Sequence, residues 1–132
     1  MNKDTLKKQT HMFIDKYKIK PCDFVVGAGG ACMMYGLRTE TRDIDVALKQ
    51  YLYEELLKSK LFETTKLSDG RFIIHYNEYI DLHPFEEGDT DIIDGVCCYS
   101  LERLLAQKLS LNRPKDQEDI KGLRKLIKIK ES

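Results

Sequence analysis

The sequence lacks an excess of charge of either sign and any long apolar run. Lys and Arg together number 22, and so do Asp and Glu, which gives a net charge of zero. General nucleic-acid binders carry a basic excess, so the composition argues against that class. No apolar run has the length needed to span a bilayer, and the chain opens with the polar stretch MNKDTLKKQ in place of a signal segment. We therefore expect a cytoplasmic protein that does not contact a membrane.

The sequence also lacks the C-x-x-C spacing of metal and redox motifs. Its four cysteines are predicted to be reduced thiols, as in most cytoplasmic proteins. Two of them are adjacent in an apolar segment that reads as a buried strand, where packing is the usual role of cysteine. The four are Cys22, Cys32, Cys97 and Cys98.

A chain of 132 residues without repeats or linkers predicts one domain, residues 1–132. Apolar periodicity and turn residues predict an α/β (α+β) fold, with a small mixed sheet flanked by helices and closed by C-terminal helices. The expected helices are the opening segment, which ends near Pro21, then residues 31–35, 51–58 and 101–111 (capped by Ser100), and a last helix to about residue 129 with Pro114 in its first turn. The expected strands cover residues 24–26, 43–48, 61–66, 71–76, 79–85 and 96–99, with an acidic loop at 86–95. The segments 71–76 and 79–85 flank Asn77-Glu78, which suggests a hairpin, although the stronger Asn-Gly signal is missing.

Two aspartates stand two residues apart on the expected strand 43–48. Asp43 and Asp45 then point to one face, while the apolar residues between and after them enter the core. Carboxylates at this spacing can share divalent cations, and Mg²⁺ is usually held by a few carboxylates together with substrate phosphates. Asp81, between two apolar residues of YIDLH, is the candidate third ligand if its strand shows the same face.

The glycines of VVGAGGA follow a strand and open a helix. Backbone N–H groups and the helix dipole at such a position can hold a phosphate, and Gly29 and Gly30 allow close approach of the backbone. A triphosphate bound there would place its metal-bound oxygens near Asp43 and Asp45. The two motifs therefore make chemical sense together.

Each signal also has an ordinary structural interpretation. Alternation alone produces an Asp-x-Asp on a half-exposed strand, and Gly-Gly after a strand is often a tight turn. The three histidines lack the paired spacing of a zinc site, so we interpret them as structural or exposed; only His83 is expected to share a face with Asp81. The other two are His11 and His75.

The motifs together resemble the DNA polymerase beta superfamily of nucleotidyltransferases. The resemblance implies the nucleotidyltransferase fold, a small mixed β-sheet flanked by helices with C-terminal helices. More closely, AGGACMMYGLRTETRDIDV is similar to the minimal nucleotidyltransferase domains grouped with abortive-infection toxins, through Ala28, Gly29, Gly30, Ala31, Gly36, Arg38, Thr41, Asp43 and Asp45. The later LLAQKLSLNRPKDQEDI resembles the closing segment of that group, through Lys108, Arg113, Lys115, Asp116 and Asp119. The family's Gly-Gly or Gly-Ser pair corresponds either to Ala28-Gly29 or to Gly29-Gly30.

The resemblance implies transfer of a nucleoside monophosphate from a nucleoside triphosphate to a hydroxyl. Asp43, Asp45 and Asp81 would hold Mg²⁺, or Mn²⁺ in its place, with Asp81 nearest the acceptor. Gly29, Gly30, Arg38, Thr41, Lys108 and Lys115 would contact the nucleotide, although a solvated helix face for the two lysines and an acidic partner for Arg38 are equally good interpretations. ATP is the default donor.

The resemblance leaves the acceptor open among a protein, an RNA and a small molecule. The surfaces that choose an acceptor usually lie outside so small a core, so we expect a homodimer or a partner protein to complete the site. The implied context is toxin–antitoxin or phage defence. Two other classes remain: a catalytically silent module that binds a nucleotide or a partner, and a metal-dependent nuclease using the same acids. A nuclease should bind nucleic acid with a steep salt dependence.

Overall fold

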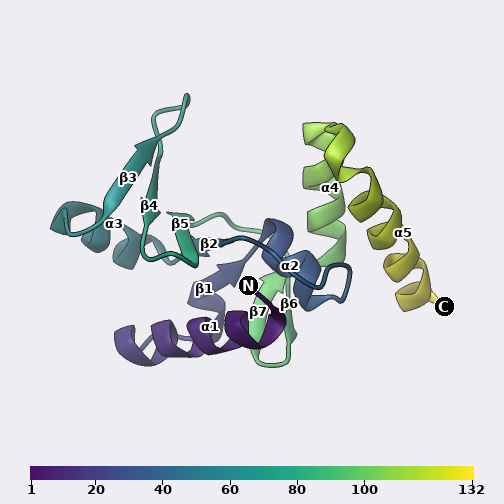
Figure 1. The fold of residues 1–132 in the computed structure, drawn as a ribbon, viewed down its shortest axis with the longest axis horizontal. Coiled ribbons are helices and arrows are strands. Elements are labelled where there is room, and N and C mark those ends of the chain that lie inside the picture. The colour runs from purple at the N-terminus through teal and green to yellow at the C-terminus, as the bar shows by residue number, and fades with distance from the viewer.

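The computed structural model describes residues 1–132 and consists of five α-helices around one seven-stranded sheet (Figure 1). The helices are α1 (Lys3–Tyr17), α2 (Ala28–Met34), α3 (Gln50–Ser59), α4 (Leu101–Leu111) and α5 (Gln117–Glu131). The strands are β1 (Phe24–Val26), β2 (Ile44–Leu48), β3 (Glu63–Lys66), β4 (Phe72–His75), β5 (Ile80–Pro84), β6 (Thr90–Ile93) and β7 (Val96–Tyr99). None of the helices combines the length and the apolar character that crossing a bilayer requires.

The sheet is mixed, with strand order β3-β4-β5-β2-β1-β7-β6. β2 runs parallel to β5 and β1 runs parallel to β7, whereas the remaining neighbours are antiparallel. The predicted class, a mixed α/β protein with a small mixed sheet, is confirmed at this level. The predicted hairpin is also found, because β4 pairs antiparallel with β5.

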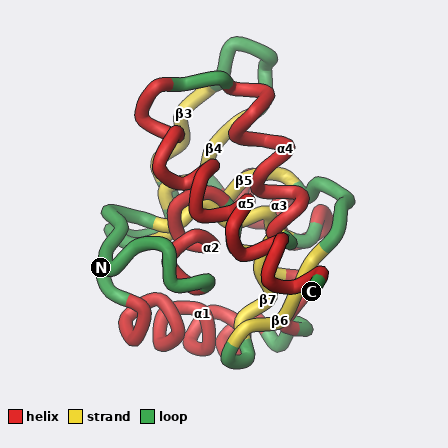
Figure 2. The backbone as a smooth tube through the Cα atoms, turned by 90° about the vertical axis from the view of Figure 1, so that its right-hand side faces the viewer, coloured by secondary structure: helices red, strands yellow, loops and turns green.

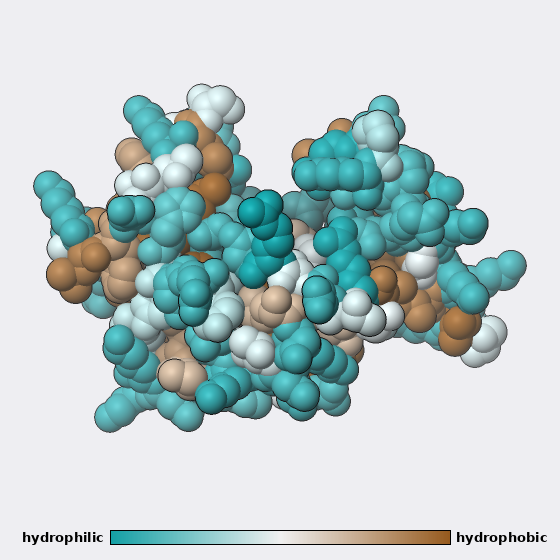
Figure 3. Space-filling model, viewed as in Figure 1, coloured by the Kyte–Doolittle hydropathy of each residue, from teal (hydrophilic) through white to brown (hydrophobic).

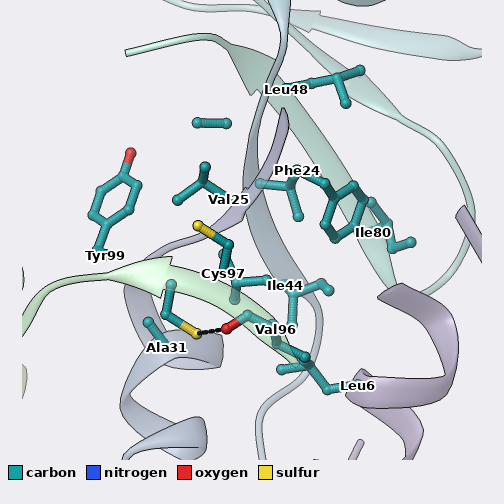
Figure 4. Close-up of a cluster of buried hydrophobic side chains, with 14 of the residues drawn as sticks. Leu6, Phe24, Val25, Ala31, Ile44, Leu48, Ile80, Val96, Cys97 and Tyr99 are labelled. Carbon is teal, nitrogen blue, oxygen red and sulfur yellow. Dashed lines mark hydrogen bonds between the residues drawn. The ribbon is translucent and has the colours of Figure 1, made fainter. Parts of the chain in front are cut away.

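One face of the sheet forms the hydrophobic core. On β2, Ile44, Val46 and Leu48 are fully buried, which is the alternation that the sequence predicts. Helix α1 packs on this core through Phe13, whose ring centroid lies 4.8 Å from that of Phe24 on β1. Figure 4 shows the buried cluster between the strands and α1, and Figure 2 places α1 at the end of the molecule away from β3 and β4. The opposite face of β2 and β5 is left for polar side chains.

Two arms rise on either side of the sheet's polar face. One arm is the β3–β4 hairpin and the other is the pair α4 and α5 (Figure 1). The space-filling view shows a notch between them, lined mostly by hydrophilic residues (Figure 3). The centre of the sheet, where β2 lies beside β5, is at the base of this notch.

Several element boundaries differ from the sequence predictions, three of them in ways that change the element. Helix α2 begins at Ala28, three residues earlier than expected, because glycines and alanine can enter a helix that is held by packing. The expected acidic loop contains strand β6, which pairs with β7 through Asp91↔Cys98 and its neighbours, so pairing outweighs the low strand propensity of acidic residues. Pro114 opens a short 3₁₀ turn that precedes α5.

The expectation of four reduced cysteines is wrong for one pair. Cys22, just before β1, forms a disulfide with Cys97 on β7, and their Cα atoms lie 5.2 Å apart. Of the adjacent pair, Cys98 is free and buried, as the packing interpretation predicts, whereas that interpretation is wrong for Cys97; Cys32 is also free and buried. The sequence offers no signal for the pairing because 75 residues separate the two cysteines.

Candidate functional site

The carboxylates of the Asp-x-Asp strand meet the third predicted aspartate on the polar face of the sheet. β2 and β5 are parallel neighbours, and Asp45 lies directly opposite Asp81 in their register. Cross-strand partners point to the same face, and Asp43, just before β2, lies near enough to Asp81 and Asp45 for both to affect its pKa. The three predicted carboxylates therefore lie together, through a topology that the sequence does not state.

These carboxylates lie close enough to affect one another. Partial burial raises the pKa of Asp43, and the hydrogen bond to Asp81 and the charges of Asp81 and Asp45 raise it further. A like charge nearby disfavours ionisation, so the three carboxylates repel one another when all of them are ionised. A cation placed among them would relieve that repulsion.

Two of the carboxylates are hydrogen-bonded to histidines. The sequence did not predict these contacts. His75 Nδ1 lies 2.8 Å from Asp81 Oδ1, and His83 Nε2 lies 3.0 Å from Asp45 Oδ1. His83 lies two residues after Asp81 on β5 and so shares its face, as predicted, and it contacts Asp45 on the neighbouring strand. With these hydrogen bonds in place, no three His, Cys, Asp or Glu side chains converge as ligands of one ion. Alternation on β4 and β5 would have indicated both histidines once the strand order was known.

The two glycines at the start of α2 have different surroundings. A Cβ on Gly29 would lie 2.9 Å from the Arg38 guanidinium nitrogen Nη1 and 3.2 Å from Thr41 Oγ1. A Cβ on Gly30 would lie 2.7 Å from the buried Ile44 side chain and 3.0 Å from Val26. Gly29 therefore faces the polar side of the molecule, and Gly30 lets α2 pack closely on the sheet.

The conformation of Ala28 bears on the register of the glycine motif. Ala28 has a φ of +47°, in the left-handed region that favours glycine. Ala28 and Gly29 line the polar cleft described below, whereas Gly30 is buried. Ala28 and Gly29 are therefore the residues of this turn that face the cleft. Gly27 supplies no side-chain cap, so the first N–H groups of α2 have no capping partner.

Arg38 and Lys108 belong to a charged network that joins α4 and α5 to the loop after α2. Arg38 donates from Nε to Asp119 Oδ1 at 3.2 Å and makes a second contact to the same carboxylate. The Lys108 Nζ lies 3.2 Å from Asp116 and 3.3 Å from Asp119. Lys108 is only 4 % exposed, so the interpretation of this lysine as part of a solvated helix face is wrong. Arg113 completes the network by donating to Asp116 at 2.6 Å.

The acidic members of the network are held ionised. Burial alone would raise the pKa of Asp116 and of Asp119. The hydrogen bonds from Arg113 and Lys108 outweigh burial at Asp116, and those from Arg38 and Lys108 outweigh it at Asp119, so both pKa values are lowered. The network is therefore a fully ionised and largely satisfied cluster at the wall of the cleft.

A polar cleft of about 750 Å³ connects the carboxylates, the glycine turn and this network. Arg42 and Lys115 line it without an acidic partner, in contrast to the paired Arg38, Lys108 and Arg113. Two of its thirteen lining residues are hydrophobic. The lining is Met1, Ala28, Gly29, Arg38, Glu40, Thr41, Arg42, Asp43, Asp45, Lys108, Arg113, Lys115 and Asp116.

A second groove of about 460 Å³ adjoins this polar cleft. The two share Ala28, Asp45 and Arg113. Half of the groove's fourteen lining residues are hydrophobic, among them Leu67 and Ile73 of the β3–β4 arm and Leu111 of α4. This groove therefore runs between the two arms, with Asp45 at the junction between the polar and the half-apolar spaces.

The chain was compared with family models, curated proteins and solved structures, and none of them matches it. A functional assignment therefore depends on the residues and the geometry described above.

Proposed function

We propose that the protein is a Mg²⁺-dependent nucleotidyltransferase that moves a nucleoside monophosphate from a nucleoside triphosphate to a hydroxyl acceptor. One observation carries the proposal: Asp43 and Asp45, two of three neighbouring carboxylates, line a polar cleft that also holds unpaired cations. Asp45 lies opposite Asp81, and Asp43 lies close to both. Arg42 and Lys115 supply positive charge in the same cleft. A substrate that brings both phosphates and a divalent cation fits this distribution of charge.

The chemistry of the donor set fits Mg²⁺, with Mn²⁺ as an alternative. Hard oxygen ligands are what these cations prefer, and Asp43, Asp45 and Asp81 would hold them. Burial is the main cause of the raised pKa of Asp43, and the charges of Asp81 and Asp45 add to it, so the ionised carboxylates repel one another without a cation. When bound, such ions neutralise phosphate charge and activate the attacking hydroxyl. His75 and His83 are hydrogen-bonded to two of the three carboxylates and would orient them.

The remaining residues would bind and position the triphosphate. Arg42 and Lys115 can contact its oxygens directly because neither is engaged by an acid. Helix α2 has only seven residues, so its dipole is short and the side-chain cations would contribute most of the attraction. Arg38, held by Asp119 and lying against Gly29, would place one more guanidinium at the glycine turn. Lys108 would act by holding this wall of the cleft.

The acceptor would enter from the half-apolar groove. In-line displacement places the attacking oxygen opposite the leaving pyrophosphate, and the groove meets the polar cleft at Asp45. The groove is open between the arms, so a protein, an RNA or a small molecule can reach it, and a partner subunit can complete it. ATP is the default donor, and the cytoplasm is the compartment we propose.

A metal-dependent nuclease is the second candidate, because its chemistry needs the same carboxylates. The neutral charge of the chain favours a triphosphate over a polymer. A silent binding module is the third candidate. Clustered carboxylates beside a phosphate site argue against it, since without a cation they would repel the ligand.

Isothermal titration of the four ribonucleoside triphosphates, with and without Mg²⁺, tests the proposal. We expect Mg²⁺-dependent binding by the wild type and its loss in the Asp43→Ala, Asp45→Ala double variant. The matched control is the double variant Asp15→Ala, Glu55→Ala, which removes two exposed acids on helices α1 and α3. It should bind the triphosphates as the wild type does. Binding that persists without both Mg²⁺ and the two aspartates would contradict the transferase and support a binding module.

A further inference from the structure

A chain of hydrogen bonds crosses three strands of the sheet and ends at Asp81. Thr65 on β3 places its Oγ1 2.7 Å from His75 Nε2, and His75 Nδ1 lies 2.8 Å from Asp81 Oδ1. The strands β3, β4 and β5 are consecutive neighbours in the sheet, so each residue comes from a different strand. The order of hydroxyl, imidazole and carboxylate is the one that orients the histidine in serine hydrolases.

The short contacts restrict where the protons lie. A carboxylate oxygen and an imidazole lone pair cannot approach to 2.8 Å without a proton between them. If Asp81 is ionised, as a cation ligand must be, that proton is on His75 Nδ1. In a neutral imidazole Nε2 is then an acceptor, and the Thr65 hydroxyl is the group that donates to it.

We propose that Thr65 and His75 are positioning residues for the cation site, acting through Asp81. The proposal rests on the proposed function, because it assigns these residues to the Mg²⁺ site of the transferase. Thr65 donates to Nε2 and selects the tautomer of His75 with its proton on Nδ1. His75 then donates to Oδ1 of Asp81, which fixes the rotation of that carboxylate and leaves its other oxygen for the cation. Such outer partners of ligands typically change metal affinity about 10- to 100-fold when they are removed.

The arrangement also links the β3–β4 arm to the carboxylates. Thr65 and His75 both lie on this arm, and the half-apolar groove is lined by Leu67 and Ile73 of the same arm. An acceptor that moves the arm would therefore also alter the support of Asp81. The third carboxylate is thus sensitive to what occupies the groove.

Calorimetric titration with Mn²⁺, in the absence of any nucleotide, tests the assignment without requiring turnover. We expect His75→Phe to weaken Mn²⁺ binding about 10- to 100-fold. Thr65→Val should weaken it by about 2- to 10-fold, the loss of one neutral hydrogen bond, and Thr65→Ser should restore it. Thr64→Val is the matched control, because Thr64 pairs with buried Ile74 and points to the other face of β3; its affinity should stay within about twofold.

The ¹⁵N chemical shifts of the imidazole, assigned by their loss in His75→Phe, provide a second readout. The wild type should show His75 with its proton on Nδ1, and Thr65→Val should increase the other tautomer. Two outcomes would overturn the inference and leave the proposed function standing. One is an Mn²⁺ affinity in both His75→Phe and Thr65→Val that equals that of the wild type. The other is a proton on Nε2 of His75 in the wild-type protein. Failure of the wild type to bind Mn²⁺ at all would overturn both.

Discussion

Gly29 and Gly30 are adjacent residues in one helix, yet a methyl group would meet different atoms at each. At Gly29 the nearest atom is the end of the flexible, partly exposed Arg38 side chain. At Gly30 the nearest atoms belong to Ile44 and Val26, which are fully buried. Side chains in a close-packed core cannot move aside at low cost, whereas a guanidinium at the surface can.

We therefore predict different outcomes for the two Gly→Ala substitutions. Both gain the same helix propensity, so the comparison isolates the contacts. Gly30→Ala should lower the free energy of unfolding by about 1–3 kcal/mol through overpacking. Gly29→Ala should cost less stability than Gly30→Ala, since only the end of Arg38 must shift against Asp119, and it should weaken triphosphate binding because it moves Arg38 in the cleft. Urea denaturation and calorimetry on both variants measure this, and equal destabilisation by the two would contradict the assignment of faces.

Asp43 is expected to reduce stability when no cation is present. A raised pKa means that the protonated carboxyl is more favoured in the folded protein than in the unfolded chain. The corresponding stability is therefore complete below the ordinary Asp pKa of about 3.9 and is lost as the pH rises through the higher folded pKa. Asp43→Asn should thus raise the free energy of unfolding at pH 7 by up to about 1 kcal/mol, a modest value because the side chain is partly solvated.

Urea denaturation at pH 7 and near pH 3 checks the sign of this effect. The difference between Asp43→Asn and the wild type should disappear at the lower pH. Mg²⁺ at pH 7 should stabilise the wild type but have a smaller effect on the variant. A variant less stable than the wild type at pH 7 would show that Asp43 makes a favourable contact in the absence of a cation.

At the scale of elements, two lysines near the α4–α5 junction have different roles. Lys108 on α4 is buried between Asp116 and Asp119, while Lys115 is exposed and lines the cleft. Removing one partner of a buried ion pair leaves uncompensated charge and typically costs about 3–5 kcal/mol. An exposed, unpaired lysine contributes little to stability.

We predict that Lys108→Met lowers the free energy of unfolding by about 3 kcal/mol. Lys115→Met should leave stability within about 0.5 kcal/mol of the wild type and weaken triphosphate binding. Denaturation curves combined with nucleotide titration separate the two roles. If Lys108→Met kept wild-type stability and lost only nucleotide affinity, Lys108 would be a phosphate ligand and not a structural one.

Acid should release α5 from the rest of the molecule before the sheet unfolds. The lowered pKa values of Asp116 and Asp119 mean that their contribution is present above about pH 3.9 and is lost as the pH falls through the folded values. Hydrogen exchange on a pH series should show protection in α5 falling first, with α1 as the internal reference. Simultaneous loss in both helices would contradict a local role for the network.

At the scale of the whole molecule, one covalent link joins distant parts of the chain. The Cys22–Cys97 disulfide ties the segment before β1 to β7 across 75 residues. In the chain-entropy account, a loop of this length contributes about 4 kcal/mol by restricting the unfolded state. Cys22→Ser should lower the free energy of unfolding by up to this amount. A reductant should bring the wild type to the same value and leave the variant unchanged.

Thiol counting provides a second check on the disulfide. Burial, followed by the charge of Asp119, raises the pKa of Cys32 to about 11, and burial, followed by the charge of Asp91, raises that of Cys98 to about 12. Neither thiol should react in the native protein at neutral pH, since the thiolate is the reactive form. Denaturation without reductant should expose two thiols. A count of four would contradict the cross-link.

Local signals predicted the elements of this fold well and their partners poorly. The alternation on β2 predicted which residues are buried, and Ser100 caps α4 by accepting from the Arg103 N–H, as expected. The acidic segment with β6 was predicted as a loop because pairing with β7 decides its conformation, and no local property of TDII indicates that partner. The candidate site shows the same division: Asp43 and Asp45 were recognisable from spacing, whereas His75 and His83 were not.

The sequence by itself determined the amphipathic helices, the buried strands and the carboxylate pair, because 3.6-residue and 2-residue periodicities are properties of neighbouring residues. Only the tertiary structure decided that β5 lies beside β2, which sets Asp81 opposite Asp45. It also decided that Cys22 meets Cys97, and that Lys108 is buried while Lys115 is exposed. Each of these depends on strand order and helix docking, which many distant and individually weak contacts specify together, so no short stretch of the chain contains them.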